Sequence, residues 1–336
     1  MRLLVLGGTV FLGRHVSEQA LARGHELTLF TRGRANPGLF PEAEHLHGDR
    51  DGGLDGLAGR GWDAVIDTSG YVPRLVSASA ELLAPSVEHY TFVSSVSIYD
   101  GNGGAGTDPD SPVGTIDDET IEEITETSYG PLKALCEQAA ERALPGRTLV
   151  VRPGLIVGPD DPTDRFTYWP ARVAEGGRVL APGRPQAQTQ VIDVRDLAGW
   201  LLDMAERRAT GVFNAVGPAR PLELGELLRR CREVSGSDAE PVWANDAWLI
   251  ECGVEIWSDL PLWLGGDPEL EWMDHVDPGP ALDAGLALRP LDQTIADTLE
   301  WHRRTAGAAG RAGFRMTRER EAELLAEWER RGRASA

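Results

Sequence analysis

Two side chains that could move a proton stand four residues apart, in the segment Tyr129-Gly130-Pro131-Leu132-Lys133. On a helix this spacing places the phenol and the ammonium on one face. Reduction of a carbonyl by hydride leaves an alkoxide that must be protonated, and a free phenol with a pKa of ~10 ionises slowly near neutral pH. An ammonium ~4 Å away in partly shielded surroundings favours the phenolate by about 4 kcal/mol. The spacing therefore predicts that Lys133 tunes Tyr129 as an acid/base.

A run rich in hydroxyl side chains precedes this pair. Residues 90–99 begin with the strand-like sequence Tyr-Thr-Phe-Val and continue as Ser94-Ser95-Val96-Ser97. In a parallel sheet such a strand delivers its hydroxyls to the carboxyl edge, where a serine can hold a carbonyl oxygen for hydride transfer. Serines that bond only to their own strand are the alternative interpretation.

A glycine-rich turn lies near the start of the chain, where Gly7-Gly8-Thr9-Val10-Phe11-Leu12-Gly13 separates an apolar strand from a helix. Gly7 can turn without a Cβ clash, and Gly13 lets the helix approach the strand. The free N–H groups around Phe11 and Leu12 would face a pyrophosphate. Position 10 holds Val, where the usual dinucleotide fingerprint has its middle glycine, so a turn without a ligand is the alternative.

The cofactor preference is read from Phe30-Thr31-Arg32-Gly33-Arg34, at the end of the second strand. Enzymes that prefer NAD usually place a carboxylate here to accept the ribose hydroxyls. This chain has Thr31 followed by two guanidinium groups, which suit a 2′-phosphate. We therefore expect NADP(H) to be preferred, with Arg32 as the main reader and Arg34 beside it. NAD(H) stays possible, and solvated arginines are the alternative.

The order of elements predicts an α/β fold with a doubly wound parallel sheet and a smaller, irregular C-terminal cap. Strand-like runs alternate with helical segments in the first half of the chain, and the sheet-like rhythm weakens from about Pro159 onward. We expect a dinucleotide-binding Rossmann domain over 1–158, completed by about 188–216. The expected substrate cap covers 159–187 and 217–310, and a helical tail with Thr317 as N-cap covers 311–336.

Composition excludes several classes of protein. The chain has 336 residues and a formal charge of −20, which argues against a nucleic-acid binder and against docking on anionic lipid. No apolar run approaches the ~20 residues of a membrane helix. Three scattered cysteines and an N-terminal strand favour a reducing, cytoplasmic setting. His45 and His47 lack a completing ligand motif, so we expect no metal.

Together, the glycine turn, the serine run, Tyr129 with Lys133 and the later Val191-Ile192-Asp193-Val194-Arg195-Asp196-Leu197 resemble the extended and atypical short-chain dehydrogenase/reductases, the NAD-dependent epimerase/dehydratase superfamily. The resemblance covers nearly the whole chain, since residues 291–303 also resemble the last helix of that family. It implies a Rossmann fold that binds a nicotinamide dinucleotide, and it is compatible with a homodimer.

The resemblance also implies roles for single residues. The catalytic hydroxyl of the family lies four residues before the tyrosine that closes the serine strand, here Tyr99, which implies Ser95 rather than Ser94. Tyr129 is then the acid/base, and Lys133 also binds the nicotinamide ribose. Asp49 matches the carboxylate that accepts the adenine amino group, and a strand-end cap is the alternative interpretation. Further implied cofactor contacts are Thr9, Arg50, Thr68, Ser69, Gly70, Ser94, Pro153 and Leu155.

The substrate side is less specific. Sugar-nucleotide members of the superfamily usually carry an arginine where this chain has Thr189, and a diphosphate needs such a cation. A nucleotide sugar is therefore disfavoured. Candidate substrate contacts are Val96, Arg165, Tyr168 and Trp169. The two aromatic side chains could instead pack within the cap, and Arg165 could be solvated.

The function predicted is NADPH-dependent reduction of a ketone or aldehyde on a small, non-nucleotide metabolite. The first alternative is an NAD(P)-dependent sugar-nucleotide epimerase or dehydratase. The second is a dinucleotide sensor or RNA-associated protein without catalysis, a route that some atypical relatives with a similar glycine turn have taken. The acidic segment 100–128 contains no Lys or Arg, and at least its first part is expected to be a mobile loop.

Overall fold

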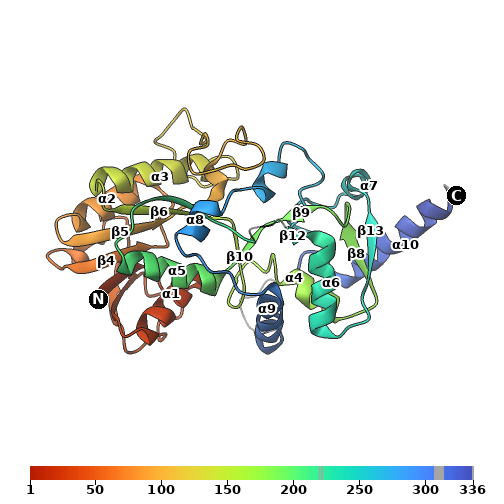
Figure 1. Ribbon diagram of the computed structural model, residues 1–336, viewed down its shortest axis with the longest axis horizontal. Helices are drawn as coiled ribbons and strands as arrows, with labels where there is room; N and C mark the ends of the chain where they lie inside the picture. The colour runs from red at the N-terminus through yellow and green to blue at the C-terminus, as the bar shows by residue number, and fades with distance from the viewer. Residues whose placement is uncertain (219, 221, 306–313, 335–336) are drawn as a thin grey trace. The chain divides into compact units, whose positions relative to one another are not determined.

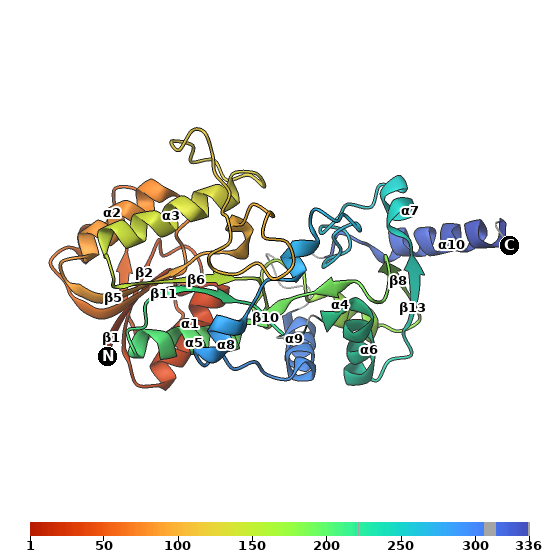
Figure 2. The ribbon, with the colours of Figure 1, turned by 45° about the horizontal axis from the view of Figure 1, so that its top comes forward.

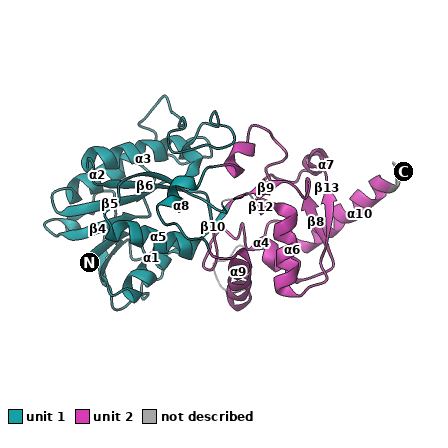
Figure 3. Cartoon of the chain, viewed as in Figure 1, with its two compact units in different colours: residues 1–156, 191–219, 276–288 teal, residues 157–190, 220–275, 289–336 magenta. Residues whose placement is uncertain are grey.

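The computed structural model describes residues 1–218, 220, 222–305 and 314–334. The chain forms two compact units (Figure 3). Unit 1 contains residues 1–156, 191–219 and 276–288, and unit 2 contains residues 157–190, 220–275 and 289–336. Residues 276–288, which the sequence analysis grouped with the cap, thus belong to unit 1. The expected ranges 217–310 and 311–336 include residues outside the described part of the chain.

Unit 1 is built on a sheet of seven strands that all run parallel, in the order β11-β6-β5-β4-β1-β2-β3. The predicted doubly wound α/β fold is confirmed. The strands are β1 (Arg2–Leu6), β2 (Glu26–Thr31), β3 (Glu44–His47), β4 (Trp62–Asp67), β5 (Val87–Val93), β6 (Thr148–Pro153) and β11 (Gly211–Ala215). Two short strands of the chain, β7 (Leu155–Val157) and β10 (Val191–Asp193), lie outside this sheet.

Helices cover both faces of the sheet, with α1 and α5 on one side and α2 and α3 on the other, as Figure 1 and Figure 2 show. The helices of unit 1 are α1 (Phe11–Ala22), α2 (Pro73–Leu83), α3 (Tyr129–Ala143), α5 (Val194–Glu206) and α8 (Gly279–Asp283), with 3-10 turns η1 (Asp55–Leu57) and η2 (Val96–Ile98). This covering explains why the apolar side chains of β1 from Leu3 to Leu6 are fully buried although successive residues face opposite sides of the sheet.

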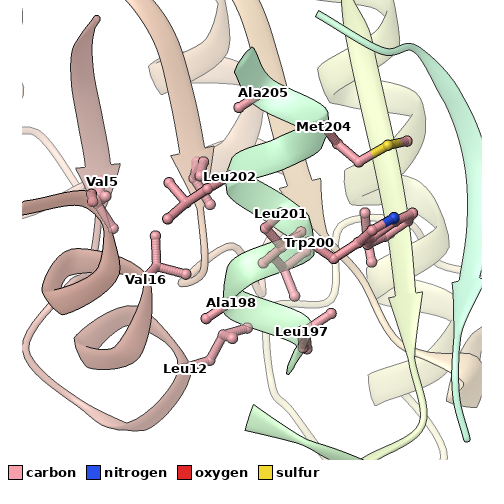
Figure 4. Close-up of a cluster of buried hydrophobic side chains, with 14 of the residues drawn as sticks. Val5, Leu12, Val16, Leu197, Ala198, Trp200, Leu201, Leu202, Met204 and Ala205 are labelled. Carbon is pink, nitrogen blue, oxygen red and sulfur yellow. The ribbon is translucent and has the colours of Figure 1, made fainter. Parts of the chain in front are cut away.

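The core under α1 and α5 shows how the sequence pattern becomes packing. Leu12, Val16 and Ala20 recur at spacing four on α1 and are buried against the sheet. From α5, Leu201 and Trp200 are buried in the same cluster (Figure 4). A second cluster lies on the other face of the sheet, under α2 and α3. These two clusters fasten the helices to the two faces of the sheet.

The acidic segment 100–128 divides into two parts. In the first part, Tyr99 bridges to Val113 in antiparallel fashion and the Gly114 N–H donates to the Ile98 carbonyl. The Arg152 guanidinium also donates to the Pro109 carbonyl at 2.8 Å. This part, which we expected to be a mobile loop, is therefore an irregular segment with specific anchors. Residues 117–127 are exposed.

Unit 2 contains helices and two small sheets. Strands β8 (Arg178–Pro182) and β13 (Glu240–Ala244) pair in parallel, and β9 (Gln188–Thr189) pairs with β12 (Leu222–Glu223) in antiparallel fashion. The helices are α4 (Tyr168–Ala174), α6 (Leu224–Ser235), α7 (Asp246–Glu251), α9 (Leu291–Thr305) and α10 (Arg318–Ala334), with a 3-10 turn η3 (Glu271–Asp274). The Arg320 N–H donates to the Thr317 hydroxyl, which confirms the predicted N-cap of the tail helix.

None of the helices in the described part of the chain is both long enough and apolar enough to cross a membrane.

Candidate active site

The glycine turn after β1 has the backbone geometry that the sequence predicts. Gly7 and Gly8 lie at φ +110° and +97°, a region that residues with a Cβ rarely adopt. A Cβ on Gly7 would stand 2.5 Å from the Thr68 hydroxyl oxygen, and one on Gly13 would stand 2.6 Å from the Gly8 nitrogen. Glycine is therefore required where the turn meets both the β4 loop and helix α1.

Side chains hold this turn in place while leaving the start of α1 open. The Ser17 hydroxyl contacts the Gly13 and Gly8 carbonyls at 2.8 and 3.1 Å, and the Asn36 amide donates to the Thr9 carbonyl at 2.8 Å. Helix α1 begins at Phe11, directly before Leu12, and no side chain caps it. An uncapped helix N-terminus after a glycine turn suits a phosphate group.

The loop after β2 presents two unpaired cations. Arg32 and Arg34 are exposed, and neither has a hydrogen-bond or ion-pair partner among the residues that the structure describes. Thr31 is half-buried, and its hydroxyl accepts from the Gly33 N–H at 3.2 Å. The guanidinium groups are thus available to an anionic ligand.

The arginine in the loop after β3, in contrast, is paired with a buried acid. Arg50, expected to contact the cofactor, forms a two-pronged ion pair with Asp67 at 2.7 and 2.8 Å. Its Nη2 also donates to the Ser79 hydroxyl at 2.5 Å, and the Tyr90 hydroxyl donates to Asp67 at 2.8 Å. Both terminal nitrogens of Arg50 are engaged inside unit 1, which leaves them no free direction toward a ligand.

Asp49 and the residues after β4 lie beside this ion pair. The Asp49 carboxylate is exposed and accepts from the Asp51 N–H at 3.1 Å, so it caps a turn with one oxygen. The hydroxyls of Thr68 and Ser69 each donate to the Leu6 carbonyl at 3.1 Å. The loops after β1, β3 and β4 are therefore joined at the carboxyl edge of the sheet.

Tyr129 is the first residue of α3, and the next residue explains its placement. A Cβ on Gly130 would overlap the Ser97 carbonyl oxygen, so only glycine lets the first turn of α3 pack on η2. Ser95 caps η2: its hydroxyl oxygen accepts from the Ser97 N–H at 3.1 Å, and its O–H donates to the Ser97 hydroxyl oxygen at 3.1 Å. The predicted hydroxyl is thus engaged with its own turn, next to the start of α3.

Ser94 differs from Ser95 in having a hydroxyl without a partner. Its Oγ is buried, with no hydrogen bond inside the described part of the chain. Val96 and Pro153 are buried, and Leu155 is half-buried. Ser94 follows β5, and Pro153 ends β6, so both lie at the edge where the other candidate residues gather.

Lys133 is the most constrained residue of the site. Its side chain is 3% exposed, and Nζ donates to the carbonyls of Gly70 and Val93 at 2.7 and 2.6 Å. Burial lowers the pKa of the Lys133 ammonium to about 8. Lys133 is also the only lysine in the sequence, the remaining 32 of the 33 basic residues being arginine. Arginine cannot titrate in this range, so the residue type matters here.

Tyr71 is a residue that the sequence analysis missed. Its ring centroid lies 6.4 Å from that of Tyr129 and 5.2 Å from the Lys133 Nζ. Burial and the neighbouring Tyr129 raise the pKa of the Tyr71 phenol. The signal available in the sequence was its place directly after Thr68-Ser69-Gly70, which the resemblance implies as cofactor contacts.

The remaining candidates lie in unit 2. Tyr168 and Trp169 are buried, with ring centroids 4.8 Å apart, and the Trp169 indole donates to the Pro261 carbonyl at 2.8 Å. The structure thus places both aromatic side chains in the packing of unit 2. Arg165 is half-buried, and its guanidinium lies 5.9 Å from the Trp257 ring.

Thr189, the position without the expected arginine, lies beside a buried acid in unit 2. Asp274 accepts a hydrogen bond from the Gln190 N–H at 3.2 Å and one from the Thr189 side chain. Burial raises the pKa of the Asp274 carboxyl to about 7. A carboxyl group next to Thr189 adds no positive charge for a diphosphate.

Within the described residues, no group of three or more His, Cys, Asp or Glu side chains is arranged to hold a metal ion. His45 and His47 lie with ring centroids 6.2 Å apart.

Comparison with known proteins places the chain in a family. The epimerase family protein SDR39U1 of Bos taurus is 30% identical over 261 residues, which cover 71% of this chain and 82% of the relative. The chain belongs to the SDR39U1 epimerase family. The predicted resemblance to the extended short-chain dehydrogenase/reductases is thereby confirmed. No protein-family model matches the sequence.

One further sequence relative and one solved structure are also similar to this epimerase-family chain. The chloroplast stem-loop binding protein of 41 kDa b of Arabidopsis thaliana is 33% identical over 257 residues, which cover 70% of this chain and 63% of the relative. The crystal structure of human SDR39U1 with NADPH superposes with a TM-score of 0.62 at 23% identity, covering 89% of this chain and 99% of that chain. The structural likeness supports the fold.

Proposed function

We propose that this epimerase-family protein is an NADPH-dependent reductase of a ketone or aldehyde on a small, non-nucleotide metabolite. The observation that carries the proposal is the single lysine of the chain, buried one helical turn after Tyr129 and bonded to Gly70 in the loop after β4 and to Val93, the last residue of β5. A buried ammonium is expensive to maintain, and acid/base chemistry at Tyr129, four residues earlier on the same helix, gives it a use.

The residues at the carboxyl edge fit a nicotinamide dinucleotide. Gly7, Gly8 and Gly13 form a cradle that a Cβ would fill, and the uncapped start of α1 follows it. These residues would hold the pyrophosphate through backbone N–H groups, as the same turn does in dinucleotide-binding folds. When bound, the dinucleotide supplies the hydride. The human relative crystallised with NADPH is consistent with this assignment.

The residues of the chain would then divide the proton chemistry among themselves. The Tyr129 hydroxyl donates its proton to the carbonyl oxygen, and the Ser95 hydroxyl holds that oxygen by a hydrogen bond, for which it must turn away from Ser97. The resulting Tyr129 phenolate is stabilised by the Lys133 ammonium on the same helix face. Solvent then returns a proton to Tyr129.

Two features support NADPH over NADH. Arg32 and Arg34 are exposed and unpaired within the described part of the chain, which suits them to a 2′-phosphate. Thr31 stands where a carboxylate would repel that phosphate. The neighbouring Arg50 is already paired with Asp67, so we assign the phosphate contact to Arg32 and Arg34 alone.

We further propose that the protein acts in the cytoplasm. The widely spaced cysteines, two of them buried, fit a reducing compartment.

The test follows NADPH absorbance while a panel of small carbonyl compounds is added. A reductase consumes NADPH in step with product, and Tyr129→Phe loses most of that turnover while its NADPH affinity stays near that of the unchanged protein. Tyr90→Phe serves as a matched control, because Tyr90 lies in the Arg50–Asp67 network rather than beside Lys133. Full turnover in Tyr129→Phe would refute the proposal.

An epimerase or dehydratase acting on a sugar nucleotide is the second candidate, favoured by the names of the relatives. MoeE5, whose structure was determined with UDP-glucose and NAD, superposes with a TM-score of 0.64 at 19% identity, covering 91% of this chain and 99% of that chain. Thr189 beside Asp274 argues against a diphosphate. Turnover without net change in the cofactor would favour this candidate.

A third candidate, an RNA-associated protein without catalysis, draws on the name of the chloroplast relative. The charge of −20 opposes it, because RNA binding needs a basic surface. Tyr129→Phe separates the cases, since it would leave RNA binding unchanged.

A further inference from the structure

The Lys133 ammonium lies in a cage of two carbonyl oxygens and two aromatic rings. Besides its hydrogen bonds to Gly70 and Val93, Nζ lies 4.3 Å from the centroid of the Phe92 ring and 5.2 Å from that of Tyr71. Aromatic faces carry negative electrostatic potential and attract a cation within about 6 Å. Phe92 is fully buried, whereas Tyr71 is 45% exposed. Tyr71 is therefore the outer wall of the cage.

Hydrogen bonding and packing fix the backbone just before Tyr71. The Ser69 N–H donates to Asp67 at 3.0 Å, and Asp67 is paired with Arg50. A Cβ on Gly70 would stand 2.5 Å from the Phe92 ring, so this residue packs directly on the inner wall. Consequently, residues 70 and 71 together supply one carbonyl and one ring to the same ammonium.

We propose that Tyr71 is a positioning residue that holds the Lys133 ammonium in this cage, and keeps it charged, through the face of its ring. The proposal rests on the proposed function only in treating Tyr129 and Lys133 as the reacting pair. Tyr71 acts through Lys133 and needs no contact of its own with the substrate.

The electrostatics around Nζ explain why an outer ring matters. Burial is the largest influence on the pKa of Lys133 and lowers it, while Cys136, Asp67 and Glu137 oppose that change and Arg50 adds to it. Of these groups, Asp67 is already neutralised by Arg50, and Glu137 pairs with Arg152 at 2.8 Å. Cys136 is a buried thiol whose pKa is raised to about 12, so it is uncharged near neutral pH. Little carboxylate charge is therefore available to stabilise the Lys133 ammonium, and the aromatic rings and carbonyl oxygens supply most of its favourable interactions.

The single lysine makes the test specific. Protein grown with lysine labelled by ¹³C at Cε gives one side-chain signal, whose shift against pH reports the titration of Lys133 directly. We compare the unchanged protein with Tyr71→Leu, which removes the ring, and with Tyr71→Phe, which keeps it. Tyr71 is half-exposed, and circular dichroism with urea unfolding verifies that both variants fold.

The titration midpoint of Lys133 should fall by about 0.5–1 pH unit in Tyr71→Leu, the size expected for loss of one cation–π contact. In Tyr71→Phe it should stay where it is in the unchanged protein. An unchanged midpoint in Tyr71→Leu would overturn the proposal. An equal fall in both variants would also overturn it, because the hydroxyl rather than the ring would then be responsible.

Failure of the proposed function gives a different result. The titration needs neither cofactor nor substrate, so a shift confined to Tyr71→Leu stands even if no carbonyl compound oxidises NADPH. If turnover is found, the alkaline limb of kcat should move to lower pH in Tyr71→Leu alone, with KM nearly unchanged.

Discussion

Strands β2 and β3 are neighbours in the sheet, and the loop after each of them carries arginine at the carboxyl edge. Arg32 and Arg34, after β2, are exposed and unpaired within the described residues. Arg50, after β3, has a side chain 11% exposed and pairs with Asp67, which is fully buried. The same side chain is thus a free cation in one loop and a structural partner in the next.

This difference shows that residue type near a motif does not decide whether an arginine reads a ligand. A buried carboxylate needs a cationic partner, and Asp67 at the end of β4 pairs with Arg50. No acid lies at the end of β2, where Thr31 stands instead. The arginines after β2 have no such partner within the described residues, because β2 ends in Thr31 rather than in a buried acid.

The largest effect is expected from removing the buried partner. Arg50→Ala leaves the Asp67 carboxylate buried and unpaired, which should lower the free energy of unfolding by about 3–5 kcal/mol in urea denaturation. The matched variant Arg32→Ala should leave the urea midpoint unchanged, because its guanidinium has no partner to lose. Equal effects of the two substitutions would abolish the distinction between the loops.

The next largest effect is expected on cofactor affinity, from substitution of the exposed arginines after β2. Arg32→Ala should weaken NADPH binding about 10–100-fold, the value of one charge-assisted contact with a phosphate, and leave NADH binding unchanged. Fluorescence titration with both cofactors measures this ratio, and Arg34→Ala should give a smaller change in the same direction. If Arg32→Ala weakens both cofactors alike, the arginine does not read the 2′-phosphate.

Acid pH should sharpen the contrast further. Burial alone would raise the pKa of Asp67, but the Arg50 guanidinium and the hydrogen bonds from Arg50, Ser69 and Tyr90 hold it below its ordinary value. A carboxyl whose pKa is depressed by folding contributes stability above its unfolded pKa of about 4, and this contribution is lost as the pH falls through the folded pKa. Urea unfolding at pH 3–5 should therefore show a steeper loss of stability in the unchanged protein than in Asp67→Asn. Parallel curves would contradict the assignment.

The smallest effect is expected at an ion pair that matches the buried one in distance but not in exposure. Arg74 contacts Glu122 at 2.6 Å and Asp51 at 2.8 Å, and all three side chains are well exposed. Arg74→Ala should leave the urea midpoint nearly unchanged, because solvent screens exposed charges. A loss comparable to that of Arg50→Ala would show that distance, rather than burial, governs these pairs.

Much of the fold could be read from local patterns. The apolar strand before the glycine turn, the second strand and the strand-like run at residue 90 correspond to β1, β2 and β5, which are apolar because both of their faces are covered. Thr317 was identified as a helix cap from its residue type and position. The edge strands β3 and β11 did not stand out as apolar runs, because their residues are more exposed and their sequences mix polar with apolar side chains. The range 188–216 that was expected to complete the Rossmann domain nevertheless contains β11.

The sequence predicted the candidate site only where the residues are brought together by their spacing along one helix or strand. Tyr129 and Lys133 share a helix face, and that follows from four residues of separation. The role of Arg50 could not be read in this way, because its partner Asp67 lies 17 residues away and meets it only after β3 and β4 join the sheet. Tyr71 was missed for the same reason, since its ring meets Lys133 of α3, 62 residues later in the chain, only after folding.

By itself, the sequence determined the parallel sheet, the glycine turn, the phenol–ammonium pair and the placement of the one lysine. These depend on local periodicity and on which backbone conformations each residue type allows. Only the tertiary structure decided which arginine is buried and which is free, and which aromatic ring encloses the lysine. Those outcomes depend on burial and on partners brought together from distant segments, and the free energy of a charge changes with its surroundings far more than with its neighbours in the chain.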